Sequence, residues 1–86
     1  MKVFVPTPLR SYTEQRGQID GEGSTLGEVL SDLDRHYPGF RFRIVSEQDD
    51  IREHIKVFIN QKQARGLTAP LHSGDEIQII CALSGG

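Results

Sequence analysis

The chain has 86 residues, and its 10 basic and 12 acidic side chains give a formal net charge of −2 at pH 7. This length fits a single small domain, and the even spread of basic residues argues against nucleic-acid binding. Cys81 is the only cysteine, which excludes an intramolecular disulfide and a cysteine metal cluster. No apolar run is long enough to cross a bilayer. We therefore expect a soluble cytoplasmic protein without a bound metal.

The first part of the chain predicts a strand, a turn and a second, weaker strand. Residues 2–5 favour β-structure and are followed by Pro6, so they predict a strand that ends in a turn. The mostly polar residues 9–18 predict a turn. A short second strand is expected over residues 18–22, and we assign the glycines at 17, 21 and 23 to turn geometry.

Residues 24–36 predict the main helix. Thr25 and Glu28 have capping-box spacing, in which the hydroxyl accepts a hydrogen bond from the third amide and the glutamate reaches back. Tyr37-Pro38-Gly39 ends the helix. Apolar residues recur at helical spacing and form one stripe, namely Leu26, Val29, Leu30 and Leu33.

The second half predicts two further strands. Residues 40–44 alternate apolar and basic side chains, which indicates an extended segment, and the acidic residues that follow predict a solvated loop. Strands are expected over 55–60 and 77–82, joined through a polar connection at 61–65 and a tight turn at 72–75. One apolar helix stripe is buried most economically across one sheet face. The sequence therefore predicts an α+β domain of the ubiquitin-like β-grasp type over residues 1–86, with 83–86 as a projecting tail.

The chain ends in Gly85-Gly86, directly after the last predicted strand. A frayed end is the plain interpretation of such a position. However, two residues without side chains can thread an extended backbone into a narrow active site where a Cβ would clash. We therefore predict that the Gly86 carboxylate is a chemical handle, and that Leu83, Ser84 and Gly85 enter the active site of a partner.

Several segments resemble those of the MoaD/ThiS-type sulfur carriers, and they occur in the same order. They are residues 6–10, 25–30, 37–39, 57–60 and the C-terminal stretch 68–86. The length and the opening segment are more similar to MoaD and CysO than to the shorter ThiS. Two positions depart from the family pattern. Gln61 follows Asn60 where glycine or aspartate is frequent, and Cys81 stands where proline is common.

The resemblance implies a protein substrate and sulfur carrier, not an enzyme. A ubiquitin-activating-type enzyme similar to MoeB or ThiF would use ATP to adenylate the Gly86 carboxylate. A sulfur donor would then displace AMP and leave a thiocarboxylate. No cofactor bound by the chain itself is implied.

The resemblance leaves the sulfur acceptor open. A MoaD-like chain would be the small subunit of molybdopterin synthase, with its tail in the large subunit. A CysO-like chain would supply a pyridoxal-phosphate-dependent cysteine synthase, and tRNA thiolation is a third use. The alternative from another class is a ubiquitin-fold protein modifier, whose Gly86 forms an amide with lysine, or a non-covalent interaction module.

Strand parity predicts an apolar patch on the outer face of the sheet. If the other apolar residues of the strands face the helix, then Phe4, Phe58 and Ile80 point away from it, and Lys2, Lys56 and Gln78 form the rim. An apolar group with a polar rim predicts a partner-docking surface. A register error, or cover by residues 40–44, is the alternative.

The remaining reactive side chains have structural interpretations. Cys81 shares its side of the strand with Ile77 and Ile79, which favours a small core residue over a reactive thiol. The histidines at 36, 54 and 72 are not clustered, so we interpret them as surface residues. The adjacent carboxylates lack a pocket or a nucleophile, and Asp75 is explained by the turn that contains it.

Overall fold

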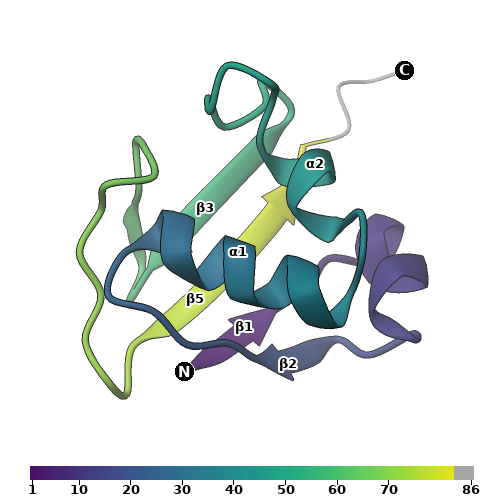
Figure 1. The fold of residues 1–86 in the computed structure, drawn as a ribbon, viewed down its shortest axis with the longest axis horizontal. Coiled ribbons are helices and arrows are strands. Elements are labelled where there is room, and N and C mark those ends of the chain that lie inside the picture. Colours follow the sequence, from purple (N-terminus) through teal and green to yellow (C-terminus); the bar gives the residue numbers. More distant parts are fainter. Residues whose placement is uncertain (83–86) are drawn as a thin grey trace.

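The computed structural model describes residues 1–82, which form one mixed sheet with the helices on one face (Figure 1). The strands are β1 (Lys2–Phe4), β2 (Gln18–Asp20), β3 (Ile55–Ile59), β4 (Lys62–Gln63) and β5 (Glu76–Cys81). Their order across the sheet is β2-β1-β5-β3-β4, with β1 and β5 parallel and the other pairs antiparallel. The predicted mixed sheet with one main helix across it is confirmed. The predicted tail, residues 83–86, lies outside the described residues.

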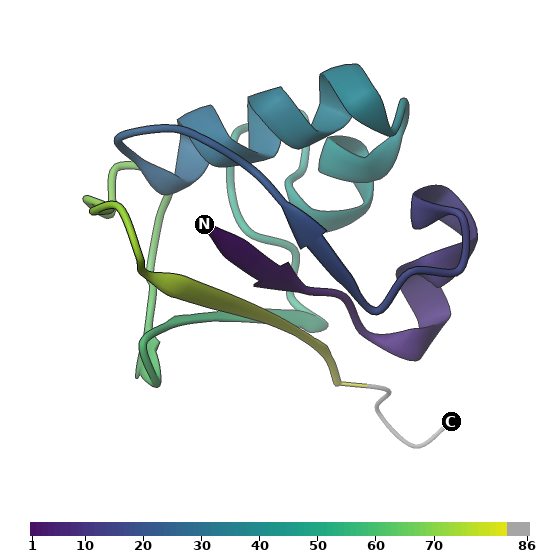
Figure 2. The same cartoon turned by 90° about the horizontal axis from the view of Figure 1, so that it is seen from below.

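The main helix is α1 (Leu26–His36), and its start follows the predicted cap. Thr25 Oγ1 accepts from the Glu28 amide at 3.2 Å, while Glu28 Oε1 accepts from the Ser24 amide at 2.9 Å. These bonds satisfy amides that have no partner inside the helix. The four residues of the predicted stripe are all fully buried. Figure 2 shows that α1 lies over one face of the sheet, whereas no helix of the described residues covers the other face.

Residues 40–44 form a short helix, α2 (Phe40–Ile44), and the prediction of an extended segment is wrong. Phe40 and Ile44 are four residues apart, so a helix places both on the core side, and both are fully buried, while Phe42 is 52% exposed. Asp34 Oδ1 accepts from the amides of Gly39 and Arg41, each at 3.1 Å, and so stabilises the helix start. The alternation of apolar residues fitted both periodicities, and packing against α1 decided between them.

The polar stretch after β1 contains a 3₁₀ helix, η1 (Thr7–Thr13), where the sequence predicted only a turn. Pro8 near its start has a φ suited to a helix, and Leu9 is buried. Thr13 is also buried, and its hydroxyl is satisfied there by donating to the backbone carbonyls of Arg10 and Arg16. The apolar anchor at Leu9 and the internal hydrogen bonds give this polar segment a fixed structure.

The polar connection after β3 forms a two-residue hairpin turn followed by β4, which the sequence analysis did not predict. Asn60 and Gln61 both have positive φ, 49° and 74°, as expected for the tight turn that matches the twist of a hairpin. Gln61 therefore occupies a strained position that glycine, asparagine or aspartate would take more easily. The departure from the family pattern at this position costs backbone energy without changing the turn.

Two of the three glycines near β2, Gly21 and Gly23, serve close packing against α1. Gly17 lies in a bend before β2, as turn geometry predicts, whereas Gly21 and Gly23 lie in no turn or bend and have no positive φ, so the prediction is wrong for these two. A Cβ on Gly23 would lie 2.7 Å from the Val29 amide nitrogen, at the start of α1. A short-range turn signal and a close contact with a distant element look the same in sequence.

The core lies between α1 and the sheet, and α2 and η1 close one end of it. It contains the inward residues of β1, β3 and β5 together with the stripe of α1 and the buried residues of α2. None of the helices within residues 1–82 is long and apolar enough to cross a membrane.

Candidate functional site

The predicted reactive group, the Gly86 carboxylate, and the predicted threading residues Leu83, Ser84 and Gly85 lie outside the described residues. What the structure describes is the support from which this segment starts. β5 is the central strand, with β1 on one side and β3 on the other, and its Ile77 and Ile79 are buried. The Ala82 amide donates to the His54 carbonyl at 2.7 Å. The chain is therefore held by the sheet up to the residue before the predicted tail.

Phe4, Phe58 and Ile80 lie together on the outer face of the sheet, as strand parity predicted, and we call them the sheet patch. Phe4 and Phe58 are both in register with Gln78, one on each side of β5. Ile80 is 37% exposed, and the two phenylalanines are half-buried. Gln78 thus lies between the two rings, and not at the rim where it was predicted.

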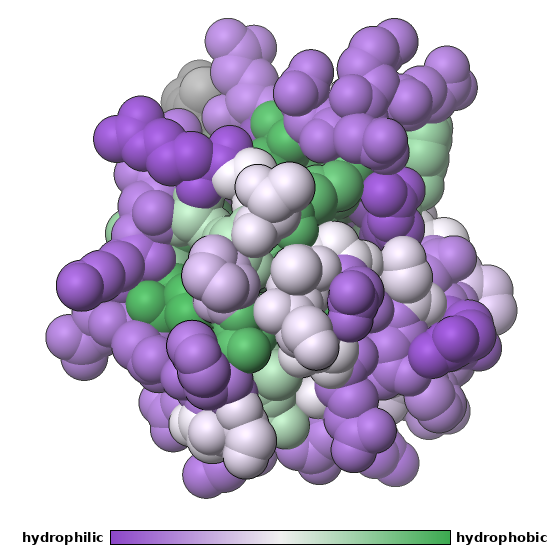
Figure 3. All heavy atoms as spheres, turned by 60° about the vertical axis from the view of Figure 1, so that its left-hand side comes forward, coloured by the Kyte–Doolittle hydropathy of each residue, from purple (hydrophilic) through white to green (hydrophobic). Residues whose placement is uncertain are grey.

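The sheet patch is not covered by the segment that could have hidden it. α2 lies on the face of α1, with Phe40 and Ile44 in the core, so it does not reach the outer face. Lys56 is in register with Ile80, and Lys2 is in register with Glu76, so lysines border the patch as predicted. On the side that Figure 3 shows, apolar residues reach the surface only in narrow areas between polar ones.

Cys81 is less buried than predicted. It lies on the same side of β5 as Ile77 and Ile79 and packs against the core, but it is only partly buried. Burial raises the pKa of the Cys81 thiol, and the nearby Arg43 guanidinium opposes this effect. The thiol is therefore neutral at pH 7, which agrees with a packing role.

The histidines and carboxylates do not assemble into a site within residues 1–82. The three histidines are exposed on different segments, and no group of side chains there could hold a metal ion. Asp75 accepts from the His72 amide at 2.8 Å and from Asn60 Nδ2 at 2.9 Å. These bonds lower the pKa of Asp75, which joins the turn before β5 to the hairpin after β3.

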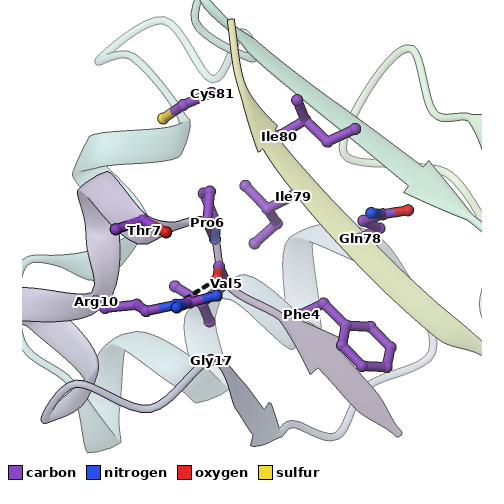
Figure 4. Close-up of a pocket in the computed structure, with 10 residues that line it drawn as sticks. All are labelled: Phe4, Val5, Pro6, Thr7, Arg10, Gly17, Gln78, Ile79, Ile80 and Cys81. Carbon is purple, nitrogen blue, oxygen red and sulfur yellow. Dashed lines mark hydrogen bonds between the residues drawn. The ribbon is translucent and has the colours of Figure 1, made fainter.

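Sequence reasoning missed a groove beside the end of β5. Its walls are Val5–Thr7 with Arg10 on one side and Gln78–Cys81 on the other (Figure 4). The volume is about 650 Å³. The groove exists because β1 ends at Phe4, whereas β5 continues to Cys81. Pro6, directly after a short predicted strand, was the signal that β1 would leave the sheet before its neighbour.

The chain is similar to a known protein family along almost its whole length. Residues 3–86 match the ThiS family. The chain is 32% identical over 89 residues to the sulfur carrier protein CysO of Mycobacterium tuberculosis, covering 98% of this chain and 96% of the relative. The predicted resemblance to this family is confirmed.

Solved structures give the same fold. A chain of the BexX/CysO complex of Amycolatopsis orientalis superposes with a TM-score of 0.91 at 30% identity, covering 99% of this chain and 98% of that one. The small archaeal modifier protein SAMP1 of Methanosarcina acetivorans superposes with a TM-score of 0.82 at 28% identity, covering 99% and 94%. The predicted ubiquitin-like β-grasp is thereby confirmed.

Proposed function

The chain belongs to the ThiS family, and from this premise we propose that it is a sulfur carrier protein whose Gly86 carboxylate is activated and converted to a thiocarboxylate. The similarity to CysO along nearly the whole chain is the observation that carries this proposal. The chain acts as a protein substrate, and the catalysis comes from its partners. It binds no cofactor itself, and the need for ATP and a reduced sulfur donor assigns it to the cytoplasm.

The chemistry requires two steps because a carboxylate is a poor electrophile. In the first step, an oxygen of the Gly86 carboxylate attacks the α-phosphorus of ATP on a MoeB/ThiF-like enzyme, and pyrophosphate leaves. In the second step, a sulfur nucleophile attacks the carbonyl carbon of the acyl-adenylate, and AMP leaves. If the nucleophile is hydrosulfide, loss of a proton gives the thiocarboxylate directly. If it is a persulfide, a second thiol cleaves the S–S bond of the acyl disulfide and is itself oxidised to a disulfide. The thiocarboxylate on Gly86 is anionic and therefore nucleophilic.

The described fold suits this role by separating the support from the reactive end. The sheet holds the chain through the Ala82–His54 hydrogen bond, so the four predicted tail residues start from a fixed point. The sheet patch offers the activating enzyme an apolar surface on the same strand, because Ile80 lies only two residues before Ala82. We assign docking of the partner to Phe4, Phe58 and Ile80, with Lys2 and Lys56 at the border.

The names of the relatives favour one of the three acceptors. The similar curated proteins are sulfur carriers named CysO, and the complex of Amycolatopsis orientalis pairs a CysO chain with BexX. We therefore place this chain with the CysO type, which supplies a pyridoxal-phosphate-dependent cysteine synthase, ahead of the MoaD type, which supplies the large subunit of molybdopterin synthase.

A second candidate function is protein modification. It is favoured by the likeness to SAMP1, which is named as a modifier protein. In that case the activated Gly86 would form an amide with a lysine of another protein. Mass spectrometry of the cellular proteome separates the two functions, because a modifier leaves a Gly-Gly remnant on lysines after digestion, and a carrier does not.

The carrier function is tested by loading the purified chain. With the adenylating enzyme, ATP and a sulfur donor, the intact chain should gain the mass of one sulfur in place of one oxygen at Gly86. Deletion of Gly86 should abolish this gain and leave the fold unchanged, because the described sheet does not include the tail. Gly85→Ala is the matched variant that keeps the carboxylate but adds a Cβ, and it should slow loading. Normal sulfur transfer by the deletion variant would refute the proposal.

A further inference from the structure

β5 has one open edge at its C-terminal end. Its pairing with β3 runs through Cys81, which is in register with Ile55. Its pairing with β1 stops earlier, where Phe4 is in register with Gln78. The Phe4–Gln78 pairing uses the Ile79 amide, so within residues 1–82 the groups left open on this edge are the Ile79 carbonyl and the backbone N–H and C=O of Cys81.

The backbone groups that face the open edge can be identified from the alternation along the strand. Glu76 accepts from the Asn60 amide at 2.9 Å, and the Ala82 amide donates to the His54 carbonyl at 2.7 Å. Even-numbered residues of β5 thus face β3 through their backbone, so Ile79 and Cys81 face the side of β1.

The chain after β1 does not fill this edge. In the parallel register, the amide that would donate to the Ile79 carbonyl belongs to Pro6, which has no N–H. The Val5 amide faces β2 and donates to the Gly17 carbonyl at 2.9 Å, and the Val5 carbonyl accepts from Arg10 Nε at 3.0 Å. The pair of Cys81 with Ile55 is a non-hydrogen-bonded one, so the backbone N–H and C=O of Cys81 point to the open edge, and within residues 1–82 no backbone bond joins them to residues 5–10.

The groove along this edge, as far as the described residues form it, contains one charged side chain, which is positive. The half-buried Arg10 lines it, and no ion pair within residues 1–82 includes this side chain. Figure 4 shows Arg10 across the groove from Ile79, with its Nε bonded to the Val5 carbonyl. Arg43 does not line the groove and lies over the Tyr12 ring, so Arg10 is the charged side chain of the lining. The floor is apolar, formed by Val5, Pro6 and Ile79.

We propose that this groove binds an extended segment of the adenylating partner, which adds a strand to β5 at Ile79–Cys81 and places an acidic side chain on Arg10. Open backbone groups provide affinity for an extended peptide, and the unpaired guanidinium provides charge complementarity. The inference rests on the proposed function for the identity of the partner. Because Cys81 stands where proline is common in the family, its N–H gives this chain a contact that such relatives lack, directly before the predicted tail.

The test compares two substitutions at Cys81 in the full chain. Cys81→Pro removes the N–H that faces the groove but leaves the pairing with β3, since the odd-numbered amides do not serve it. Cys81→Ala keeps this N–H and removes the thiol. Titration calorimetry with the purified adenylating enzyme should show affinity lowered about tenfold by Cys81→Pro, the value of one hydrogen bond of ordinary strength. Cys81→Ala should bind as the parent does.

The charge is tested in the same titration. Arg10→Gln should weaken binding about fivefold or more, and the loss should shrink at high salt. Arg16→Gln removes the same charge from an exposed residue outside the groove and should bind as the parent does. Loading at saturating enzyme should remain normal in all four variants, because the tail is unchanged. If Cys81→Pro and Arg10→Gln bind like the parent while loading proceeds, the groove proposal is overturned and the carrier function stands.

Amide hydrogen exchange of the full chain identifies the occupant. The Cys81 amide should exchange rapidly in the free chain and should be protected in the complex. Protection in the free chain at low concentration would mean that the chain's own tail occupies the edge, and protection that grows with chain concentration would mean a second copy. Either result overturns the proposal.

A partner-independent probe separates this inference from the proposed function. If the parent neither binds the adenylating enzyme nor is loaded, the carrier function fails, and a capped hexapeptide of alternating valine and glutamate decides the groove. Its titration should move the amide resonances of Ile79–Cys81 and Thr7, with loss of the effect in Arg10→Gln. Unmoved resonances would overturn the groove proposal as well.

Discussion

Leu30→Ala measures how strongly α1 is fixed to the sheet that supports the tail. Leu30 is fully buried in the stripe of α1. The substitution removes three carbon atoms, which at about 0.8 kcal/mol per buried methylene amounts to roughly 2.4 kcal/mol of lost transfer free energy. The cavity that remains adds to this loss, so we expect a total of about 2–5 kcal/mol.

Such a loss is large for this domain. A chain of this length has a free energy of unfolding of about 5–8 kcal/mol, near the lower end for globular proteins. A loss of 1 kcal/mol lowers the melting temperature by about 4–8 °C in a domain of this size, so Leu30→Ala should melt at least about 10 °C below the parent. Calorimetry and urea unfolding followed by circular dichroism measure the two quantities independently.

Ser31→Ala is the matched control on the same turn of α1. Ser31 is exposed, so this change should alter the free energy of unfolding by less than about 0.5 kcal/mol. If Leu30→Ala unfolds at the same temperature and urea concentration as Ser31→Ala, then the packing of α1 on the sheet contributes little to stability. The account of the core given above would then be wrong.

Three further predictions concern the sheet patch, a glycine contact and a carboxylate. Phe58→Ala should destabilise the fold less than Leu30→Ala, because Phe58 is half-buried on the outer face of the sheet. The same change should weaken binding of the activating enzyme by about 2 kcal/mol. Thermal unfolding and titration calorimetry measure the two effects, and unchanged affinity would remove the docking role. Gly23→Ala should lower the melting temperature, because the added Cβ would meet backbone atoms of α1. Gly66→Ala should not, because there is open space around Gly66. Equal melting temperatures of the two variants would contradict the close-contact explanation. Hydrogen bonds lower the pKa of Asp75, so its contribution to stability is present above the usual pKa of 3.8 and is lost as the pH falls through the lowered pKa. The free energy of unfolding of Asp75→Asn, measured in urea, should therefore depend less on pH between pH 5 and pH 2. An unchanged pH profile would exclude this contribution.

The sequence alone determined the elements whose signals are local. Thr25 and Glu28 fixed the start of α1, and the spacing of Leu26 to Leu33 fixed its buried side, because a cap and a helical stripe depend only on residues within one or two turns. Strand parity was enough to put Phe58 on the outer face for the same reason. The diglycine end and the order of family segments pointed to the sulfur carriers, which the comparisons confirmed.

Tertiary structure decided the features that depend on contacts between segments far apart in the sequence. Residues 40–44 fit a strand and a helix equally well by pattern, and only the space beside α1 selected the helix that buries Phe40 and Ile44. The role of Gly23 came from α1, which packs too closely for a Cβ. The open edge of β5 depends on where β1 stops relative to Cys81, and that register is set by pairing across more than seventy residues of chain. Local patterns carry no information on such a register, because the free energy that fixes it is gained only when the sheet and its core form together.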